Sequence, residues 1–293
     1  YNTGVSFSTG LMGNHLVFDG AYHETATDGY IDGTDGRSGS YYGGLTWLGD
    51  NFKISYKNIG NFEKTGQAWN GVLGGDYNSN FTLLDDGIRT YKDMYKAGLD
   101  KFNVLTGDLV RNDKGDYTIT PYTLRDGSKW DKTTDNFYQN HNILSATWTP
   151  GSHWSHSLSL HYTYGYGYYK EFKNNAKFEK FGLIYKDAEG NKVKKSDFIR
   201  KKGLTQNTYG MVYNTNYKDE HWDVIGGLNL QQFRGNHWGY LTYIANQDAE
   251  KQFLGSNGKY KYYDSDAHKY DYSAFIKASY RFADYWNAFA DLQ

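Results

Sequence analysis

The length, composition and charge of this 293-residue chain exclude several classes of protein. The net charge of −1 argues against a nucleic-acid-binding surface, which needs a basic stripe, and the lack of cysteine removes disulfides and thiolate metal sites. A mean hydropathy of −0.81, with no apolar run of about 18 residues, excludes a helical membrane protein. Aromatic residues make up 18% of the chain, beside 34 glycines and 2 prolines, which is typical of long strands joined by glycine-rich turns.

The chain consists of pairs of alternating segments, each pair joined by a short turn. The pairs are 5–11 with 16–22, 41–47 with 52–56, 138–148 with 154–168, 209–217 with 222–230, and 270–280 with 286–292. Longer connections separate the pairs, at approximately 26–37, 62–136, 170–203 and 234–269. Because side chains in the paired segments alternate with a period of two, we predict about ten antiparallel strands in an up-and-down order.

The clearest of these strands is residues 154–168, with the sequence WSHSLSLHYTYGYGY. Its even positions are bulky and mostly apolar, whereas its odd positions are small or polar, so the two faces of the strand differ. The segment has 15 residues, against about 5–6 in an ordinary soluble strand. Leucines lie in its middle and tyrosines toward one end, as in a strand that passes from hydrocarbon to headgroups. We predict a transmembrane β-strand.

The connections and the tryptophans extend this interpretation to the whole chain. Short turns and long loops alternate strictly, as the periplasmic turns and outer loops of membrane barrels do. Five of the eight tryptophans lie within a few residues of a short turn, namely Trp47, Trp148, Trp154, Trp222 and Trp286. Indole prefers the headgroup boundary, so we predict that these five form an aromatic belt at one membrane interface. The small polar residues of the opposite face predict a water-filled interior.

We expect residues 1–293 to be an internal part of one barrel domain. The chain begins at Tyr1 without an initiator methionine, and it ends at Gln293 inside a strand pattern. Ten strands leave two unpaired edges, which lipid does not tolerate. The ten strands should therefore form a curved, incompletely closed sheet that belongs to a larger barrel.

Seven stretches, taken together, carry a resemblance to a known family. They are YKNIGN at 56–61, GQAWNG at 66–71, DNFYQNH at 135–141, HYTYGYGYY at 161–169, RKKGL at 200–204, GNHWG at 235–239 and FADLQ at 289–293. In combination they resemble the TonB-dependent outer-membrane receptors that are common in Bacteroidetes. The resemblance implies a 22-stranded barrel with an N-terminal plug in the bacterial outer membrane. It also implies import of a scarce, bulky nutrient with energy from the TonB–ExbB–ExbD complex, reached through the plug.

The sequence indicates neither catalysis nor a resident metal or cofactor. Asp85 and Asp86 are adjacent, so on an extended chain their carboxylates point apart. Ser155 and His156 also lie on opposite faces, which disfavours an outer-membrane lipase. None of the nine histidines shows a tight metal-binding spacing. We therefore expect a protein that is not an enzyme.

Ligand contacts are expected in the loops, because recognition usually lies in loops on a rigid scaffold. The loop aromatic residues either contact a bulky ligand or pack on one another; they are Trp69, Tyr77, Trp130, Trp238, Tyr240, Tyr243, Tyr260, Tyr262 and Tyr263. His237 and His268, at the edges of one predicted loop, are the histidines best placed to touch a ligand. The basic run from Lys192 to Lys202 would attract an anionic chelate, pair with lipopolysaccharide or remain solvated.

The resemblance favours an iron chelate such as a siderophore or haem as cargo, with a corrinoid next and an oligosaccharide after that, and we predict a ferric siderophore-like ligand. Its predicted contacts are His237, Trp238, Tyr240, Lys201 and Lys202, together with Trp69 and Trp130. A passive porin or fatty-acid channel is the alternative within membranes, and it would lack a plug. A secreted β-rich protein that binds glycans is the alternative outside membranes, and it would stay in the soluble fraction without detergent.

Overall fold

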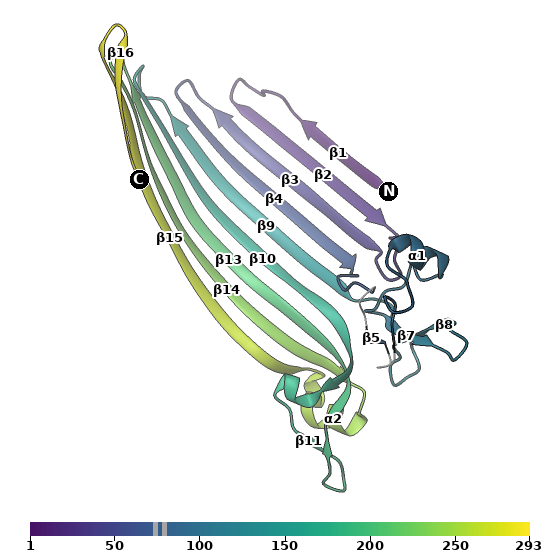
Figure 1. Ribbon diagram of the computed structural model, residues 1–293. Coiled ribbons are helices and arrows are strands. Elements are labelled where there is room, and N and C mark those ends of the chain that lie inside the picture. Colours follow the sequence, from purple (N-terminus) through teal and green to yellow (C-terminus); the bar gives the residue numbers. More distant parts are fainter. Residues whose placement is uncertain (73–75, 78–80) are drawn as a thin grey trace.

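The computed structural model describes residues 1–72 and 81–293, together with the backbone of Asp76–Tyr77. Within these residues, ten long strands form one antiparallel sheet in which each strand pairs with its neighbours in sequence (Figure 1). In sheet order they are β1 (Asn2–Ser8), β2 (Leu16–Thr27), β3 (Gly36–Leu48), β4 (Phe52–Gly66), β9 (Thr134–Trp148), β10 (Trp154–Lys177), β13 (Lys195–Lys218), β14 (Trp222–Ile244), β15 (Tyr260–Ala283) and β16 (Trp286–Leu292).

The sheet is curved and open, because β1 and β16 lie at its two edges and each pairs with one strand only (Figure 1). Short turns join the strands at one end, and the long connections lie at the other end. This arrangement confirms the predicted fold class, an antiparallel up-and-down sheet of about ten strands that is incompletely closed.

The strands are longer than predicted, and the loops are correspondingly shorter. β10, β13 and β15 each contain 24 residues. The long connections are 28–35, 67–133, 178–194 and 245–259 rather than 26–37, 62–136, 170–203 and 234–269. The reason is that charged residues on both faces hide the period of two, although the backbone continues to pair, as at Lys170–Lys201 and Glu171–Arg200.

The long connections carry the remaining small elements. The 67–133 connection holds β5 (Asp76–Tyr77), β6 (Phe81–Thr82), α1 (Tyr91–Lys96), β7 (Gly107–Arg111) and β8 (Tyr117–Pro121). The 178–194 connection holds the 3-10 helix η1 (Phe178–Phe181), β11 (Tyr185–Lys186) and β12 (Lys192–Val193), and the 245–259 connection holds α2 (Gln247–Leu254) and the 3-10 helix η2 (Gly255–Asn257). In the described part of the chain, no helix is long and apolar enough to cross a membrane.

Strand register aligns the non-polar residues of eight strands in one row. Residues paired across strands share a face, and the row is Phe18, Leu45, Tyr56, Leu144, Leu160, Met211, Leu230 and Tyr272. Six of these side chains are between 40% and 46% exposed. We call this side of the sheet the apolar face. The row one residue away lies on the opposite side, the polar face, and contains Val17, Thr46, Ser55, Ser145, Ser159, Val212, Asn229 and Ser273.

The five tryptophans near the short turns lie together on the apolar face. All are exposed, and several stack on neighbouring rings. Trp154 lies 4.9 Å from Tyr217 and Trp222 lies 4.4 Å from Tyr280, measured between ring centroids. Their clustering beside the turns agrees with the sequence, whereas their location at a membrane interface stays a prediction.

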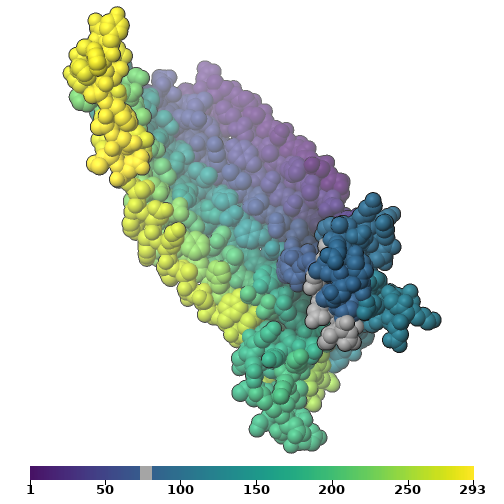
Figure 2. Space-filling view, viewed as in Figure 1, coloured from purple at the N-terminus to yellow at the C-terminus, as the bar shows by residue number. Residues whose placement is uncertain are grey.

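The buried hydrophobic residues of the described chain lie at the loop end rather than along the sheet. Figure 2 shows the 81–133 and 178–194 segments gathered at that end. One cluster packs Phe178 and Phe198 against Leu254 of α2, and a second surrounds Met94 of α1. The third joins Trp130 to Phe172 and Ile199. The long connections are therefore folded caps on the ends of the strands, and the middle of the sheet has no core on either side.

Candidate functional site

The predicted ligand contacts lie on strands, and the strands divide them between two faces. His237 and Trp238 are consecutive residues of β14, so their side chains leave opposite sides of the sheet. Trp238 and Tyr240 share the apolar face with Lys201, which pairs with Tyr240. His237 and Lys202 lie on the polar face. The five residues therefore lie on two different surfaces, whereas in a loop they could have faced a single ligand. Their contact with a ligand stays a prediction.

A pocket of about 390 Å³ opens on the polar face near the loop end of the sheet. It spans the six strands from β4 to β15, and among its lining residues are Glu63, Asp135, Phe137, Tyr169, Lys202, His237 and Tyr263. Gly167 permits this shape, because a Cβ there would come within 2.4 Å of the Phe137 ring. His237, Lys202 and Tyr263 were among the contacts predicted from the sequence. Glu63, Asp135 and Tyr169 were not, since these three residues fell outside or at the edges of the predicted loops.

The pocket combines one lysine, Lys202, and two acids, Glu63 and Asp135, with aromatic rings. The Lys202 amino group lies 5.6 Å from the ring centroid of Tyr169 and 5.9 Å from that of Tyr263. Trp69, in the 67–133 connection, meets Tyr169 edge-on at 5.4 Å and is 46% exposed. The rings suit a bulky organic ligand with aromatic parts.

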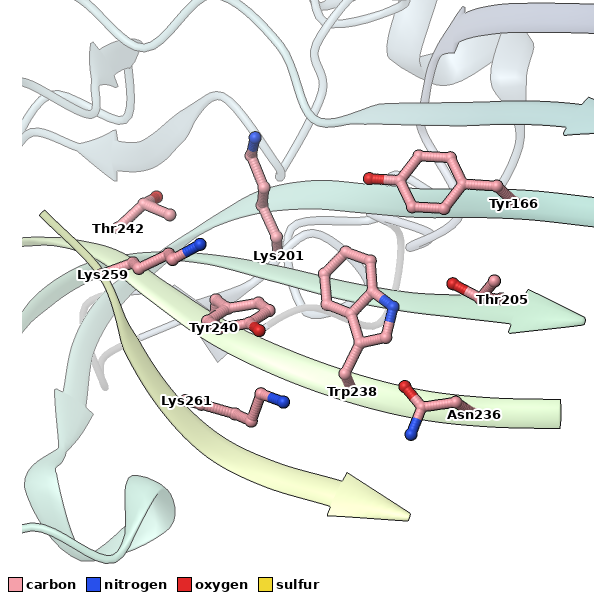
Figure 3. Close-up of a pocket in the computed structure, with 9 residues that line it drawn as sticks. All are labelled: Tyr166, Lys201, Thr205, Asn236, Trp238, Tyr240, Thr242, Lys259 and Lys261. Carbon is pink, nitrogen blue, oxygen red and sulfur yellow. The ribbon is translucent and has the colours of Figure 1, made fainter. Parts of the chain in front are cut away.

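A second pocket, of about 350 Å³, lies on the apolar face and is lined by the predicted contacts Lys201, Trp238 and Tyr240 (Figure 3). The Trp238 ring lies 5.2 Å from Tyr240 and 6.2 Å from Tyr166. Gly203 makes room for it, because a Cβ there would come within 2.3 Å of the indole. Lys201 reaches the same pocket from β13. This pocket and the polar-face pocket lie on opposite sides of the sheet.

The other predicted contacts mostly pack the loop caps. Trp130 is 6% exposed and packs against Phe172 with the two tilted rings 5.9 Å apart between centroids, so it follows the alternative in which the loop residues pack on one another. Tyr243, Tyr260 and Tyr262 also pack against buried clusters. The side chain of Tyr77 lies outside the described residues.

His237 and His268 are not at the edges of one loop. His237 pairs with Ser265, and His268 pairs with Arg234, both well inside β14 and β15. The pairing places His268 on the apolar face, opposite to His237. Among the residues that the structure describes, no group of three or more His, Cys, Asp or Glu side chains could hold a metal ion.

No protein-family model and no curated protein matches the sequence. Among solved structures, the chain is similar to the ferric yersiniabactin uptake receptor FyuA from Yersinia pestis, with a TM-score of 0.42 and 9% identity over 99% of this chain and 43% of that one. It is also similar to the ferric-catecholate import receptor Fiu from E. coli K12, with a TM-score of 0.34 and 7% identity over 99% of this chain and 53% of that one. The chain spans about half the length of these structures. Similarity at this level identifies neither a family nor a ligand for this chain.

Proposed function

We propose that this chain is part of an outer-membrane barrel that binds and imports a scarce, bulky nutrient. The observation that carries the proposal is the row of eight non-polar side chains across eight strands, most of them exposed. Burying one such side chain stabilises a protein by about 1.5–3 kcal/mol, so a soluble protein would cover the row with other parts of its chain. In a membrane protein, lipid covers such a row instead.

The spacing of aromatic residues on the apolar face fits the thickness of a membrane. Trp154 and Tyr166 are 12 residues apart on β10 (166 − 154). At about 3.3 Å per residue this is about 40 Å along the strand, or about 30 Å along the membrane normal for a tilt of about 40°. An apolar band of about 25 Å between two aromatic girdles is what a membrane barrel presents to lipid.

The open edges of the sheet support a barrel with more strands. Lipid leaves an unpaired strand edge without hydrogen-bond partners, so β1 and β16 require further strands beside them in a membrane. That the complete barrel has 22 strands and a plug, and takes its energy from the TonB–ExbB–ExbD complex, is proposed on the family resemblance.

We propose the polar-face pocket as the cargo site, with a ferric siderophore or a similar chelate as its ligand. The pocket faces the interior of the proposed barrel, where imported cargo would pass. Lys202 provides a positive charge for an anionic chelate, while Tyr169 and Tyr263 provide rings and hydroxyl groups. Trp69 adds a ring from the loop cap beside Tyr169.

Two adjacent lysines supply the test, because Lys201 and Lys202 point to opposite faces. We expect Lys202→Ala to weaken the binding of ferric catecholate or ferric hydroxamate chelates about five- to tenfold, which corresponds to about 1–1.4 kcal/mol. Lys201→Ala should leave the affinity within about twofold, since that side chain lies in the other pocket. Affinity is measured on the detergent-solubilised protein at its natural length.

Uptake into cells and fractionation without detergent, added to the affinity measurements, separate the alternatives. If neither variant changes affinity and uptake into cells is neither saturable nor sensitive to a protonophore, the protein is a passive channel. If the native protein stays in the soluble fraction without detergent, the barrel proposal fails and a secreted binding protein replaces it.

A further inference from the structure

A cluster of lysines lies at the loop end of the apolar face, beside the pocket of Trp238. Lys170, Lys201, Tyr240 and Lys261 form one row across four strands, from β10 to β15. Lys259 lines the same pocket, and Figure 3 shows Lys259 and Lys261 on either side of the Tyr240 ring. We call Lys170, Lys201, Lys259 and Lys261 the rim lysines.

Most of the positive charge of the rim lysines is not neutralised by the protein. Lys261 forms an ion pair with Asp264 at 2.6 Å. Within the described chain, Lys170, Lys201 and Lys259 form no ion pair, and their amino groups lie over aromatic rings instead. The rim lysines therefore present positive charge that suits an external anion.

From the rim lysines toward the short turns, the side chains of the apolar face change from charged to aromatic to aliphatic. A lipid molecule changes in the same order from its headgroup to its acyl chains. Tyr166, Trp238 and Tyr240 form an aromatic layer next to the lysines. The row of Leu160 and Met211 follows, ten residues from Lys201 along β13 (211 − 201). That distance is about 33 Å along the strand and about 25 Å along the membrane normal at a tilt of about 40°. Cations, rings and then aliphatic side chains match a headgroup, its boundary and its acyl chains.

We propose that the rim lysines bind the phosphorylated headgroup of an outer-leaflet glycolipid such as lipid A. Lys201 and Lys259 contact its phosphate groups, and its acyl chains lie along Tyr166 and Trp238 toward the apolar row. The Thr205 hydroxyl, which also lines the pocket, is placed to bond a sugar hydroxyl. This inference rests on the proposed function, because the apolar face must lie in lipid.

The experiment measures lipid binding to the solubilised, natural-length protein by native mass spectrometry. The ligand probes are diphosphorylated lipid A, the same lipid after removal of both phosphates, and inorganic phosphate as a competitor. The test variant is Lys201→Gln/Lys259→Gln. Its matched control is Lys180→Gln/Lys194→Gln, which removes from the 178–194 connection two exposed lysines that form no ion pair with any residue the structure describes.

We expect the test variant to bind diphosphorylated lipid A about twenty- to thirtyfold more weakly, since each lysine near an anionic lipid surface contributes roughly a factor of five. The control variant should stay within about twofold of the wild type, and the dephosphorylated lipid should bind the wild type as weakly as lipid A binds the test variant. Equal losses in both variants, or equal binding of the two lipids, would overturn the inference. Displacement of lipid A by inorganic phosphate would identify a site for free anions instead.

Failure of this inference is distinguishable from failure of the proposed function. Brominated acyl chains quench tryptophan fluorescence on contact, so vesicles made with such lipids report whether the apolar face lies in lipid. Absence of quenching would refute the proposed function. Quenching together with unchanged lipid A binding by Lys201→Gln/Lys259→Gln would refute the headgroup site alone.

Discussion

An arginine at position 160 should destabilise the protein far more than an arginine at position 159. Leu160 belongs to the exposed row of the apolar face, whereas Ser159 belongs to the polar face and shares a 2.8 Å hydrogen bond with Ser145. The two positions have almost the same depth and strand neighbours. Their difference therefore isolates the medium that each face meets.

The size of this destabilisation follows from the depth of Leu160 in the proposed membrane. Leu160 lies six residues from Trp154 (160 − 154), which is about 20 Å along the strand and about 15 Å along the membrane normal. That depth is close to the middle of an apolar band of about 25 Å, where arginine costs about 2–4 kcal/mol. Leu160→Arg should thus lower the folding equilibrium constant about thirty- to seven-hundredfold. Ser159→Arg should lose little more than one hydrogen bond, about 0.5–1.5 kcal/mol.

Both variants are measured by reversible urea unfolding of the natural-length protein in lipid vesicles. Ser159→Ala is the control, because it removes the Ser145 hydrogen bond without adding charge. Equal destabilisation by Leu160→Arg and Ser159→Arg, after this correction, would refute the assignment of the two faces.

Three further outcomes are expected. Protease added to intact cells should cut within 67–133, 178–194 or 245–259 and spare 219–221 and 149–153; the reverse pattern of fragments would invert the topology. Trp130→Ala should make the 67–133 connection more protease-sensitive, since truncating a buried tryptophan costs about 3–5 kcal/mol, whereas Trp69→Ala should not. Burial raises the pKa of Tyr122 from 10.0 to about 12, so the contribution of its protonated phenol is complete below pH 10.0 and is lost as pH rises through about 12. Tyr122→Phe should reduce this alkaline loss of structure, followed by near-ultraviolet circular dichroism, and an unchanged profile would contradict the burial argument.

The fold was predictable because its determinants are local. Each of 154–168 and 270–280 carries a period of two that fixes both the strand and its faces. Turn and loop lengths then order the strands, since antiparallel neighbours need only short turns. The strand ends were not predictable, because the pairs Lys170–Lys201 and Glu171–Arg200 place charge on both faces while the backbone ladder continues.

The arrangement of the predicted contact residues could not be read from the sequence. Lys201, Lys202, His237 and Trp238 were predicted as contacts because they follow one another in segments expected to be loops. In a loop such neighbours can turn toward one ligand. In strands they cannot, since successive side chains alternate between the faces.

Because successive side chains alternate between the two faces of the sheet, neighbouring residues contact two different environments in the proposed barrel. Lys202 and His237 lie where a solute inside the barrel would pass, while Lys201 and Trp238 lie where lipid would meet the wall. A shift of register by one residue would exchange these sets and move Leu160 and Met211 to the interior. In the proposed barrel, the exposed row therefore fixes which side chains face the interior as well as which face lipid. For this reason, the comparison of Leu160→Arg with Ser159→Arg tests the interior position of Lys202, on which its proposed cargo contact depends, together with membrane insertion.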